Sequence, residues 1–254
     1  MTQKIAEIKT IFQGTPVCGL PEFIRIYSGD NRSGVRAMVR SAGRKLEVLK
    51  KEQERTERMR EYERAFQEYA WICGIDEVGR GPLAGPVVAG AVILPKDCDI
   101  LYLNDSKQLS EKQREELYGQ IMEQAEATGL GFVSPERIDE INILQATYEA
   151  MRQAIDSLGK VPDLLLNDAV TIPQITIRQV PIIKGDTKSI SIAAASIIAK
   201  VARDRLMVEY DEVFPEYGFA SNKGYGTPVH LEALEKYGPS PIHRHSFLKN
   251  RIVD

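Results

Sequence analysis

The chain has 254 residues, of which 43% are hydrophobic and 27% charged, and its net charge is −3. This length allows one large domain or a domain with an appendage. No apolar run reaches the roughly 18 residues that a membrane helix requires, and the N-terminus lacks the apolar segment of a signal peptide. We therefore expect a cytoplasmic protein that does not enter a membrane. Its three separated cysteines (Cys18, Cys73 and Cys98) are expected to be reduced and buried.

Charge divides the chain into two parts. Residues 1–70 carry 14 Lys and Arg against 10 Asp and Glu, whereas residues 71–254 carry 19 against 26. The charged composition gives way to an apolar one near Tyr69-Ala70. We therefore predict two domains, a basic helical N-terminal extension over 1–69 and a main domain over 70–254.

In the N-terminal extension we expect a short helix opened by Leu20-Pro21-Glu22 and a long polar helix from about Asn31 to about Glu68. Four arginines recur in the long helix at every fourth residue, a spacing that places them on one helix face: Arg32, Arg36, Arg40 and Arg44. Such a row suits contacts with nucleic-acid phosphates. An ordinary solvated helix surface explains the pattern equally well.

The main domain is predicted to alternate strands and helices. Apolar, β-branched runs predict strands at 71–75, 86–95, 129–133, 163–170 and 175–183. Capping signals and glycine or proline boundaries predict helices at 110–127, 134–158, 189–213 and 227–238. This order predicts a mixed α/β domain.

A glycine-rich loop follows the first strand. The segment GIDEVGRGPLAGP, residues 74–86, contains G-x-G-x-x-A, the loose form of a dinucleotide-binding fingerprint. Such a fingerprint opens a helix, whose N-terminus receives the pyrophosphate. Here the loop leads into a strand, so we expect no nucleotide cofactor. The alternative is a metal site beside a loop that closely approaches a ligand, because Asp76 and Glu77 directly precede the loop.

Carboxylates stand at the ends of three predicted strands. Asp76 and Glu77 end the first strand, Asp168 lies near the end of the fourth, and Asp186 lies just past the fifth. Ligands bind at strand ends in α/β sheets, and an Asp within an apolar strand is costly to bury unpaired. Oxygen ligands without histidine or thiolate favour Mg²⁺ or Mn²⁺ over zinc. Pairs of such ions serve phosphoryl transfer.

Several segments together resemble ribonuclease HII of bacterial type. Over about residues 71–248 the similarity is carried by GIDEVGRGPLAGPVVAGAVIL, LNDSKQLS, KGDTKSISIAAASIIAKVARDRLM, NKGYGTPVHLEAL and PIHRHSF. The resemblance implies an RNase H-like fold, with a five-stranded mixed sheet, flanking helices and a small C-terminal helical part. It implies hydrolysis of the RNA strand in RNA–DNA hybrids. It also implies cutting on the 5′ side of single ribonucleotides embedded in duplex DNA, leaving 5′-phosphate and 3′-hydroxyl ends, and hence ribonucleotide removal from DNA.

The resemblance also implies roles for single residues. The four carboxylates Asp76, Glu77, Asp168 and Asp186 match the residues that bind two divalent ions, Mn²⁺ or Mg²⁺, and carry catalysis. The loop Gly79-Arg80-Gly81 matches the one that recognises the ribose 2′-hydroxyl through its backbone. Tyr225 matches the tyrosine that stacks at the junction and contacts that hydroxyl.

Other positions carry weaker expectations. Asp105-Ser106-Lys107 matches a phosphate-contacting motif. We also expect Lys184 to bind the substrate. Asn167 stands where an apolar residue is expected before Asp168. His243 and His245 are expected to be packing or surface residues, Lys200 and Asp204 to form a structural ion pair, and residues 193–199 to pack closely as a helix.

Two other functions stay open at this stage. One is a DNA-directed carboxylate nuclease of the same fold, which would have no use for a 2′-hydroxyl sensor. The other is a non-catalytic nucleic-acid-binding protein, which would have no use for the four carboxylates. We further expect a monomer, with no partner-binding tail after Phe247.

Overall fold

A computed structural model describes residues 3–248 of the chain. The polypeptide divides into two compact units, Met1–Glu57 and Arg58–Asp254. The predicted boundary near residue 69 lies further along the chain, so residues 58–69 belong to the second unit. Within residues 3–248, no helix is long and apolar enough to cross a membrane. Cys73 and Cys98 are free and buried as expected, but Cys18 is exposed.

The first unit is helical and has its own small core. It contains α1 (Ile5–Gly14), α2 (Leu20–Tyr27) and most of α3 (Ser33–Met59), with the short 3₁₀ turn η1 (Val17–Gly19) before α2. Five buried side chains form the core: Ile8, Leu20, Phe23, Val35 and Ala42. The predicted helix to Glu68 is too long, because the chain leaves helical geometry at Arg60 and begins a separate α4 (Glu61–Ala65).

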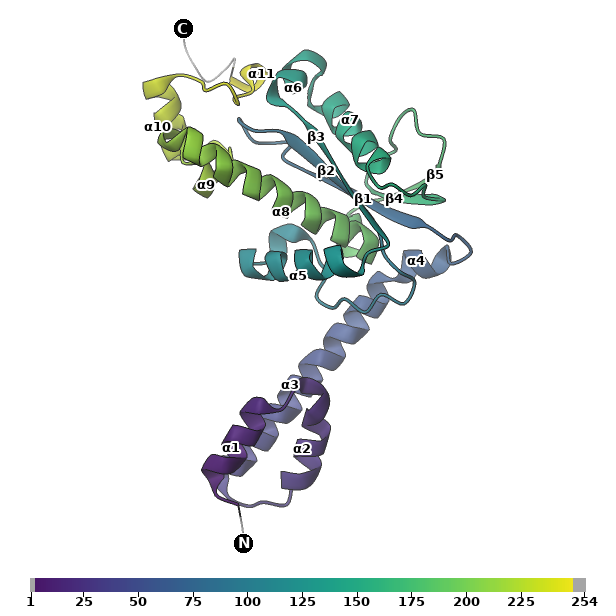
Figure 1. Cartoon of the computed structure of the whole chain (residues 1–254), viewed down its shortest axis with the longest axis vertical. Helices are drawn as coiled ribbons and strands as arrows, with labels where there is room; N and C mark the ends of the chain where they lie inside the picture. Colours follow the sequence, from purple (N-terminus) through teal and green to yellow (C-terminus); the bar gives the residue numbers. More distant parts are fainter. Residues whose placement is uncertain (1–2, 249–254) are drawn as a thin grey trace. The chain divides into compact units, whose positions relative to one another are not determined.

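A five-stranded mixed sheet organises the second unit (Figure 1). Its strands are β1 (Ile72–Val78), β2 (Val87–Ile93), β3 (Ala127–Val133), β4 (Leu164–Asp168) and β5 (Arg178–Ile182), in the order β3-β2-β1-β4-β5. The pairs β1–β2 and β2–β3 are antiparallel, whereas β1–β4 and β4–β5 are parallel. This confirms the predicted fold class and all five strands.

After α4, the helices of the second unit are α5 (Glu111–Gln124), α6 (Pro135–Ile141), α7 (Ile143–Asp156), α8 (Ile190–Val213), α9 (Phe219–Asn222), α10 (Pro228–Tyr237) and α11 (His245–Leu248). The single helix predicted over 134–158 is therefore wrong. Asn142 interrupts it with φ of 69° and ψ of 163°, a conformation rare outside glycine, so the helix cannot continue through this residue. Its side chain accepts hydrogen bonds from the amides of Leu144 and Gln145, so it caps a new helix.

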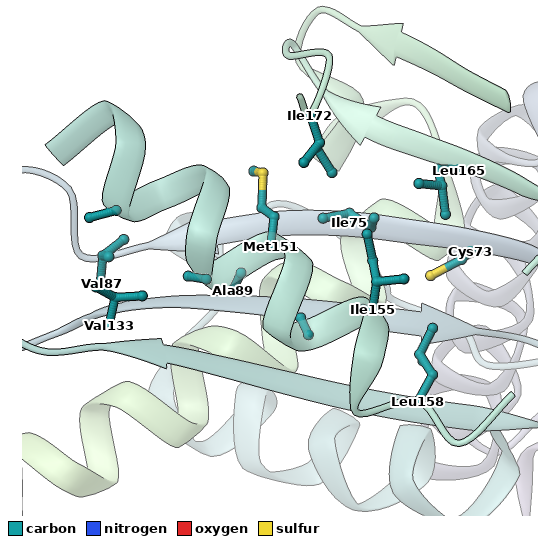
Figure 2. Close-up of a cluster of buried hydrophobic side chains, with 14 of the residues drawn as sticks. Cys73, Ile75, Val87, Ala89, Val133, Met151, Ile155, Leu158, Leu165 and Ile172 are labelled. Carbon is teal, nitrogen blue, oxygen red and sulfur yellow. The ribbon is translucent and has the colours of Figure 1, made fainter. Parts of the chain in front are cut away.

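Helices cover both faces of the sheet. Figure 2 shows Met151 and Ile155 of α7 packed toward Ile75 of β1 in the core on one face. On the other face, α8 lies directly against the strands. A Cβ on Gly74 would lie 2.1 Å from the backbone of Ser191, and one on Gly90 would lie 2.4 Å from the Ala195 carbonyl oxygen. These glycines allow the close packing predicted for residues 193–199.

The helices α9 and α10 gather at the end of α8 (Figure 1). The hydrophobic core there contains Tyr217 and Phe219, whose rings stack with their centroids 5.3 Å apart. His243 packs there as expected, with its Nε2 atom 2.9 Å from Nε2 of His230, whereas His245 is exposed. Burial lowers the pKa of His243 to about 4, so the imidazole is neutral at pH 7.

The segment that precedes the sheet is fastened to the start of α8. Glu63 of α4 accepts hydrogen bonds from the Ser189 hydroxyl (2.6 Å) and the Ser191 amide (3.1 Å). Ser189 is itself the N-cap of α8. The carboxylate therefore satisfies an unpaired amide of the first turn, where the positive end of the helix dipole favours a negative charge.

This contact predicts a stability effect. Glu63→Ala removes both hydrogen bonds, which contribute about 1–2 kcal/mol together. We expect the melting temperature to fall by roughly 2–6 °C in a thermal scan, given the size of this unit. Glu61→Ala, an exposed change on the same helix, is the matched control. Equal melting temperatures for the two variants would contradict a stabilising cap.

Candidate active site

Asp76 and Asp168 lie side by side on adjacent strands. The parallel register of β1 and β4 runs to the pair Ile75 and Asn167, so the next residues on each strand are these two carboxylates. Neighbouring strands are about 4.8 Å apart. The first strand is longer than predicted and extends to Val78, so Asp76 and Glu77 lie within its last residues rather than beyond its end.

Asp186 reaches the same place from the turn after β5. It lies in the 3₁₀ turn η3 (Gly185–Thr187), and the Gly185 amide donates a 2.7 Å hydrogen bond to Oδ1 of Asp168. The side chain of Asp186 is buried, whereas the preceding Lys184 is exposed and adopts a left-handed backbone with φ of 57°. The turn therefore carries Asp186 and, through the Gly185 amide, also holds the Asp168 carboxylate.

Burial and mutual repulsion disfavour the charged forms of these groups. The pKa of Asp76 is raised well above its usual value, first by burial and then by the charges of Glu77 and Asp168. Burial is also the largest cause of the raised pKa of Glu77, with Asp168 adding repulsion. The pKa of Asp186 is raised by burial, then by Asp105 and Asp168. The carboxylates therefore act on one another as a single electrostatic cluster.

Two basic side chains stand beside this cluster. Arg80 Nη1 lies 3.3 Å from Oε1 of Glu77. Burial alone would lower the pKa of the Lys107 ammonium, yet the combined field of Asp105, Asp76, Asp186 and Glu77 leaves it raised. Lys107 and Arg80 thus offset part of the negative charge.

The segment Asp105-Ser106-Lys107 is attached to the cluster through a chain of hydroxyls. Asp105 caps the 3₁₀ turn η2 (Ser106–Gln108) by accepting from the Lys107 amide. The Ser106 hydroxyl lies 2.9 Å from the Ser196 hydroxyl, and Ser196 hydrogen-bonds the Asp76 carboxylate. Sequence reasoning did not identify Ser196, which lies in the stretch assigned only to helix packing.

The glycine loop and Tyr225 form a second group next to the carboxylates. Gly79 has φ of 88°, and a Cβ there would lie 2.3 Å from Nε of Arg203. Gly81 is exposed, and its missing Cβ would lie 3.7 Å from the Tyr225 ring. Tyr225 is 45% exposed, and the Leu83 amide holds its segment by donating to the Gly224 carbonyl at 2.8 Å. The predicted loop and tyrosine are therefore neighbours.

The loop rests on two arginines that the sequence did not single out for function. Arg203 of α8 and Arg244 before α11 are fully buried and donate to loop carbonyls. In the sequence only Lys200 and Asp204 stood out here, and their expected ion pair forms at 2.7 Å. Asn167 is also buried, and its amide donates to the Gln179 side chain at 2.8 Å, so a polar partner replaces the expected apolar contact.

The four N-terminal arginines do not form one free row. Arg32 precedes α3, is half-buried and pairs with Asp30 at 2.5 Å. Arg36, Arg40 and Arg44 are exposed on α3 within the first unit. Three of the four predicted phosphate contacts are thus sterically available on this helix.

The donor set fits a hard divalent cation, although its members are not drawn together around one point. In the part of the chain that the structure describes, no three His, Cys, Asp or Glu side chains converge closely enough to hold a metal ion. The nearby acidic groups nevertheless supply only oxygen donors, and their repulsion is what a bound cation would relieve. A cation would also favour the ionised form of Asp76.

The sheet order and the flanking helices define a class of protein. The structure is similar to ribonuclease H2 from Pyrococcus horikoshii, with a TM-score of 0.59 and 30% identity over 69% of this chain and 93% of that one. A Bst-RNase HIII structure supports the fold alone, at a TM-score of 0.52 and 18% identity over 66% and 63% of the two chains. The chain is thus a hydrolase of the RNase H-like fold class.

The family follows from the sequence matches. The family model described as Ribonuclease HII matches residues 73–250, and the one described as Ribonuclease HII N-terminal domain matches residues 4–67. Ribonuclease HII of Lachnoclostridium phytofermentans is 67% identical over 88% of each chain. That of Clostridioides difficile is 54% identical over 98% of each. This chain belongs to the ribonuclease HII family, and it is an endoribonuclease. Residues 249–254, where no partner-binding tail is expected, lie outside the described residues.

The raised pKa of Asp76 predicts an unusual stability change. A carboxyl whose pKa is higher in the folded state binds more protons when folded, so stability is lost as pH rises from the unfolded value near 3.9 through the raised folded value. In excess chelator at pH 8, Asp76→Asn should therefore melt several degrees above the parent. Its melting temperature should also vary less with pH.

Thermal scans from pH 4 to pH 8 measure this directly. Glu232→Gln, an exposed change on α10, is the control and should follow the parent. A lower melting temperature for Asp76→Asn at pH 8 without divalent ions would contradict the repulsion account.

Proposed function

We propose that this protein hydrolyses the RNA strand of RNA–DNA hybrids and cuts on the 5′ side of single ribonucleotides in duplex DNA. The observation that carries the proposal is the adjacency of two groups on one strand and its following loop. The carboxylates Asp76 and Glu77 lie among the last residues of β1, and Gly79-Arg80-Gly81 follows beside Tyr225, joined to them by the Glu77–Arg80 pair. The cleavage site and the ribose-binding site would thus both be held in place by β1 and the loop that follows it. The products would carry 5′-phosphate and 3′-hydroxyl ends.

The proposed metal ligands are Asp76, Glu77, Asp168 and Asp186, holding two Mn²⁺ or Mg²⁺ ions. When bound, such a pair activates the attacking water and stabilises the leaving oxygen. The chain keeps its own groups in position for this. Ser196 holds the Asp76 carboxylate, and the Gly185 amide holds that of Asp168. Lys107 and the exposed Lys184 would contact substrate phosphates near the scissile bond.

Selection of ribose would come from the loop and the tyrosine. The 2′-hydroxyl is both donor and acceptor, and it distinguishes RNA from DNA at one nucleotide. Backbone groups of the loop Gly79-Arg80-Gly81 can reach it because the exposed Gly81 presents no side chain. The exposed ring of Tyr225 can stack on the neighbouring sugar or base. A site that pairs with the hydroxyl would reject a deoxyribose, which leaves its polar groups unpaired.

We further propose that the protein acts as a monomer in the cytoplasm, where bacterial DNA lies. Residues 1–69 would be an accessory for substrate binding, and the remainder would carry the reaction. This assignment is supported by the exposed Arg36, Arg40 and Arg44 on one unit and the carboxylates on the other.

Removing one carboxylate should abolish most of the activity. Asp76→Asn, Glu77→Gln and Asp168→Asn should each lower kcat about a thousandfold or more, because several kcal/mol of charge stabilisation are lost. Asp186→Asn should be milder if it holds an ion less directly. A gel assay on an RNA–DNA hybrid with Mn²⁺ measures these rates, with Glu232→Gln as the control. Rapid cleavage in excess chelator would refute the metal-dependent mechanism.

Ribose selection should depend on Tyr225 and Gly81. Tyr225→Ala should lower kcat/KM on a duplex with one ribonucleotide roughly ten- to a hundredfold, as expected for a lost stacking contact. Gly81→Ala should fold normally, because its methyl group would meet the Tyr225 ring only at ordinary contact distance. It should still lose at least tenfold in kcat/KM by filling the substrate face.

The matched substrate replaces the single ribose by deoxyribose and should not be cut at that position. If Tyr225→Ala cleaves the ribonucleotide duplex as fast as the parent at low substrate concentration, the tyrosine is structural. Cutting of the all-DNA duplex by the parent would favour a DNA-directed nuclease of the same fold.

The N-terminal arginines should contribute to the salt dependence of binding. Replacing Arg36, Arg40 and Arg44 by Gln should reduce the log–log slope of affinity against salt by roughly 0.9 for each lost phosphate contact on a B-form duplex. The cleavage rate at saturating substrate should not change. Arg25→Gln, which disrupts an exposed pair with Glu22, is the control in the same unit. An unchanged slope would mean that these arginines contact no phosphates and form an ordinary solvated surface of α3.

A further inference from the structure

Arg203 and Arg244 are buried cations whose hydrogen-bond partners within residues 3–248 are all backbone carbonyls. Both side chains are 0% exposed. Arg203 donates to Pro86 at 2.9 Å, Lys223 at 2.9 Å and Ala84 at 3.1 Å. Arg244 donates to Gly85 at 2.8 and 2.9 Å, Arg80 at 3.0 Å and Gly79 at 2.5 Å. The carbonyls belong to two segments, residues 79–86 and Lys223.

Burying a guanidinium in this way is costly. Desolvation lowers the pKa of Arg203 to about 10 and that of Arg244 to about 9. A packed apolar side chain of similar size would carry no such penalty. Each guanidinium can instead bind several carbonyls at once with its planar fork of five donors. The arrangement therefore fixes the direction of loop carbonyls that have no strand or helix partner.

Fixing these carbonyls also fixes the amides that follow them. No peptide bond in the described residues is cis, and the C=O and N–H of a trans peptide point in opposite directions. Since the Gly79 and Arg80 carbonyls point at Arg244, the amides of Arg80 and Gly81 point away from it. Neither amide donates to a protein acceptor in the described structure. Both residues are exposed, and Gly81 lies next to the Tyr225 ring.

Arg203 connects the loop with the tyrosine segment. It binds Ala84 and Pro86 on one side and Lys223 on the other. Lys223 lies two residues before Tyr225, whose position thereby becomes tied to the loop. One arginine thus directs the free amides, and the other keeps the ring beside them.

We propose that Arg244 and Arg203 are positioning residues for ribose recognition, which hold two loop amides and the Tyr225 ring in register toward the 2′-hydroxyl. This inference rests on the proposed function, and neither arginine touches substrate. A side chain that only filled the core would affect stability and the active fraction. These two should instead change the ratio of affinities for ribose and deoxyribose.

The test compares two duplexes that differ in a single 2′-hydroxyl. Binding is measured with Ca²⁺, and a gel verifies that the strands stay intact. Arg244→Lys and Arg203→Lys keep the charge but replace the planar fork of five donors by a compact ammonium, which cannot reproduce the hydrogen-bond geometry toward carbonyls in separate directions. Arg205→Lys, an exposed change on α8 that pairs with Glu115, is the matched control. We expect each positioning variant to lower the ribose-to-deoxyribose affinity ratio about tenfold or more. Affinity for the all-DNA duplex should stay within about twofold, and the control should match the parent.

The outcomes separate this inference from the proposed function. If the parent itself does not prefer the ribonucleotide duplex, the proposed function fails. If the parent discriminates and both lysine variants discriminate equally well, the positioning role fails. Loss of affinity for both duplexes in parallel would also overturn it, because that indicates a purely structural role.

A measurement on the parent covers the case in which the lysine variants do not fold. Hydrogen exchange of the Arg80 and Gly81 amides should be fast in the free protein. It should slow about tenfold or more with the ribonucleotide duplex, and much less with the all-DNA duplex. Amides already protected in the free protein, or equally protected by both duplexes, would overturn the inference.

Discussion

The rest of the structure depends on the repulsion between carboxylates placed at the ends of β1 and β4. Asp76 is held between the sheet and α8, where burial and its neighbours raise its pKa. A protein does not maintain such an arrangement for stability, because ionised carboxylates that repel one another destabilise the folded state. The cost is acceptable where a divalent cation binds and reverses the sign of the local field. The surrounding fold keeps these groups together until that happens.

Several parts of the second unit serve this constraint. Gly74 and Gly90 let α8 lie directly on the sheet, which brings Ser196 to Asp76. The turn after β5 brings the Gly185 amide to Asp168. At the start of α8, Glu63 fastens the segment that precedes β1. The carboxylates are therefore held by backbone and hydroxyl donors from several directions, which preorganises them without neutralising them.

Charged groups are also held by hydrogen bonds without being neutralised at the glycine loop, but here they are cations. There, Arg203 and Arg244 are buried among carbonyls, and in the described residues the Arg80 and Gly81 amides donate to no protein acceptor. An acidic centre and a set of oriented donors thus stand next to each other, joined by the strand that carries Asp76 and Glu77. This pairing suits a substrate whose scissile phosphate and neighbouring 2′-hydroxyl must be bound together.

The sequence predicted those elements of the fold whose signals come from residues close together in the chain. Strands with β-branched runs, such as β2, and helices with capping boxes, such as α5, were predicted because their signals are local. The helix break at Asn142 was missed, because a lone asparagine within a helical pattern has no strong local signature of a positive φ. The early end of α3 was missed because its charged pattern continues past Arg60.

The candidate site shows the same division. Asp76 and Asp168 could be paired from their strand-end positions, since parallel neighbours align their ends. The roles of Ser196, Arg203 and Arg244 could not be predicted. Their partners lie in distant segments, and a buried arginine bound to carbonyls has the same sequence appearance as an exposed one. The pairing of Arg32 with Asp30 was missed for a different reason, because helical periodicity ignores the residue before the helix.

Calorimetry of Mn²⁺ binding in buffers with different ionisation enthalpies tests the central claim most directly, because it counts the protons released. Metal ligands must be deprotonated, so carboxyls with raised pKa values release protons when the ion binds. The account predicts measurable proton release by the metal-free protein at pH values above the ordinary carboxyl range. Release should decline as pH rises, and it should be smaller in Asp76→Asn. Saturable Mn²⁺ binding with no proton release at any pH between 5 and 8 would contradict it.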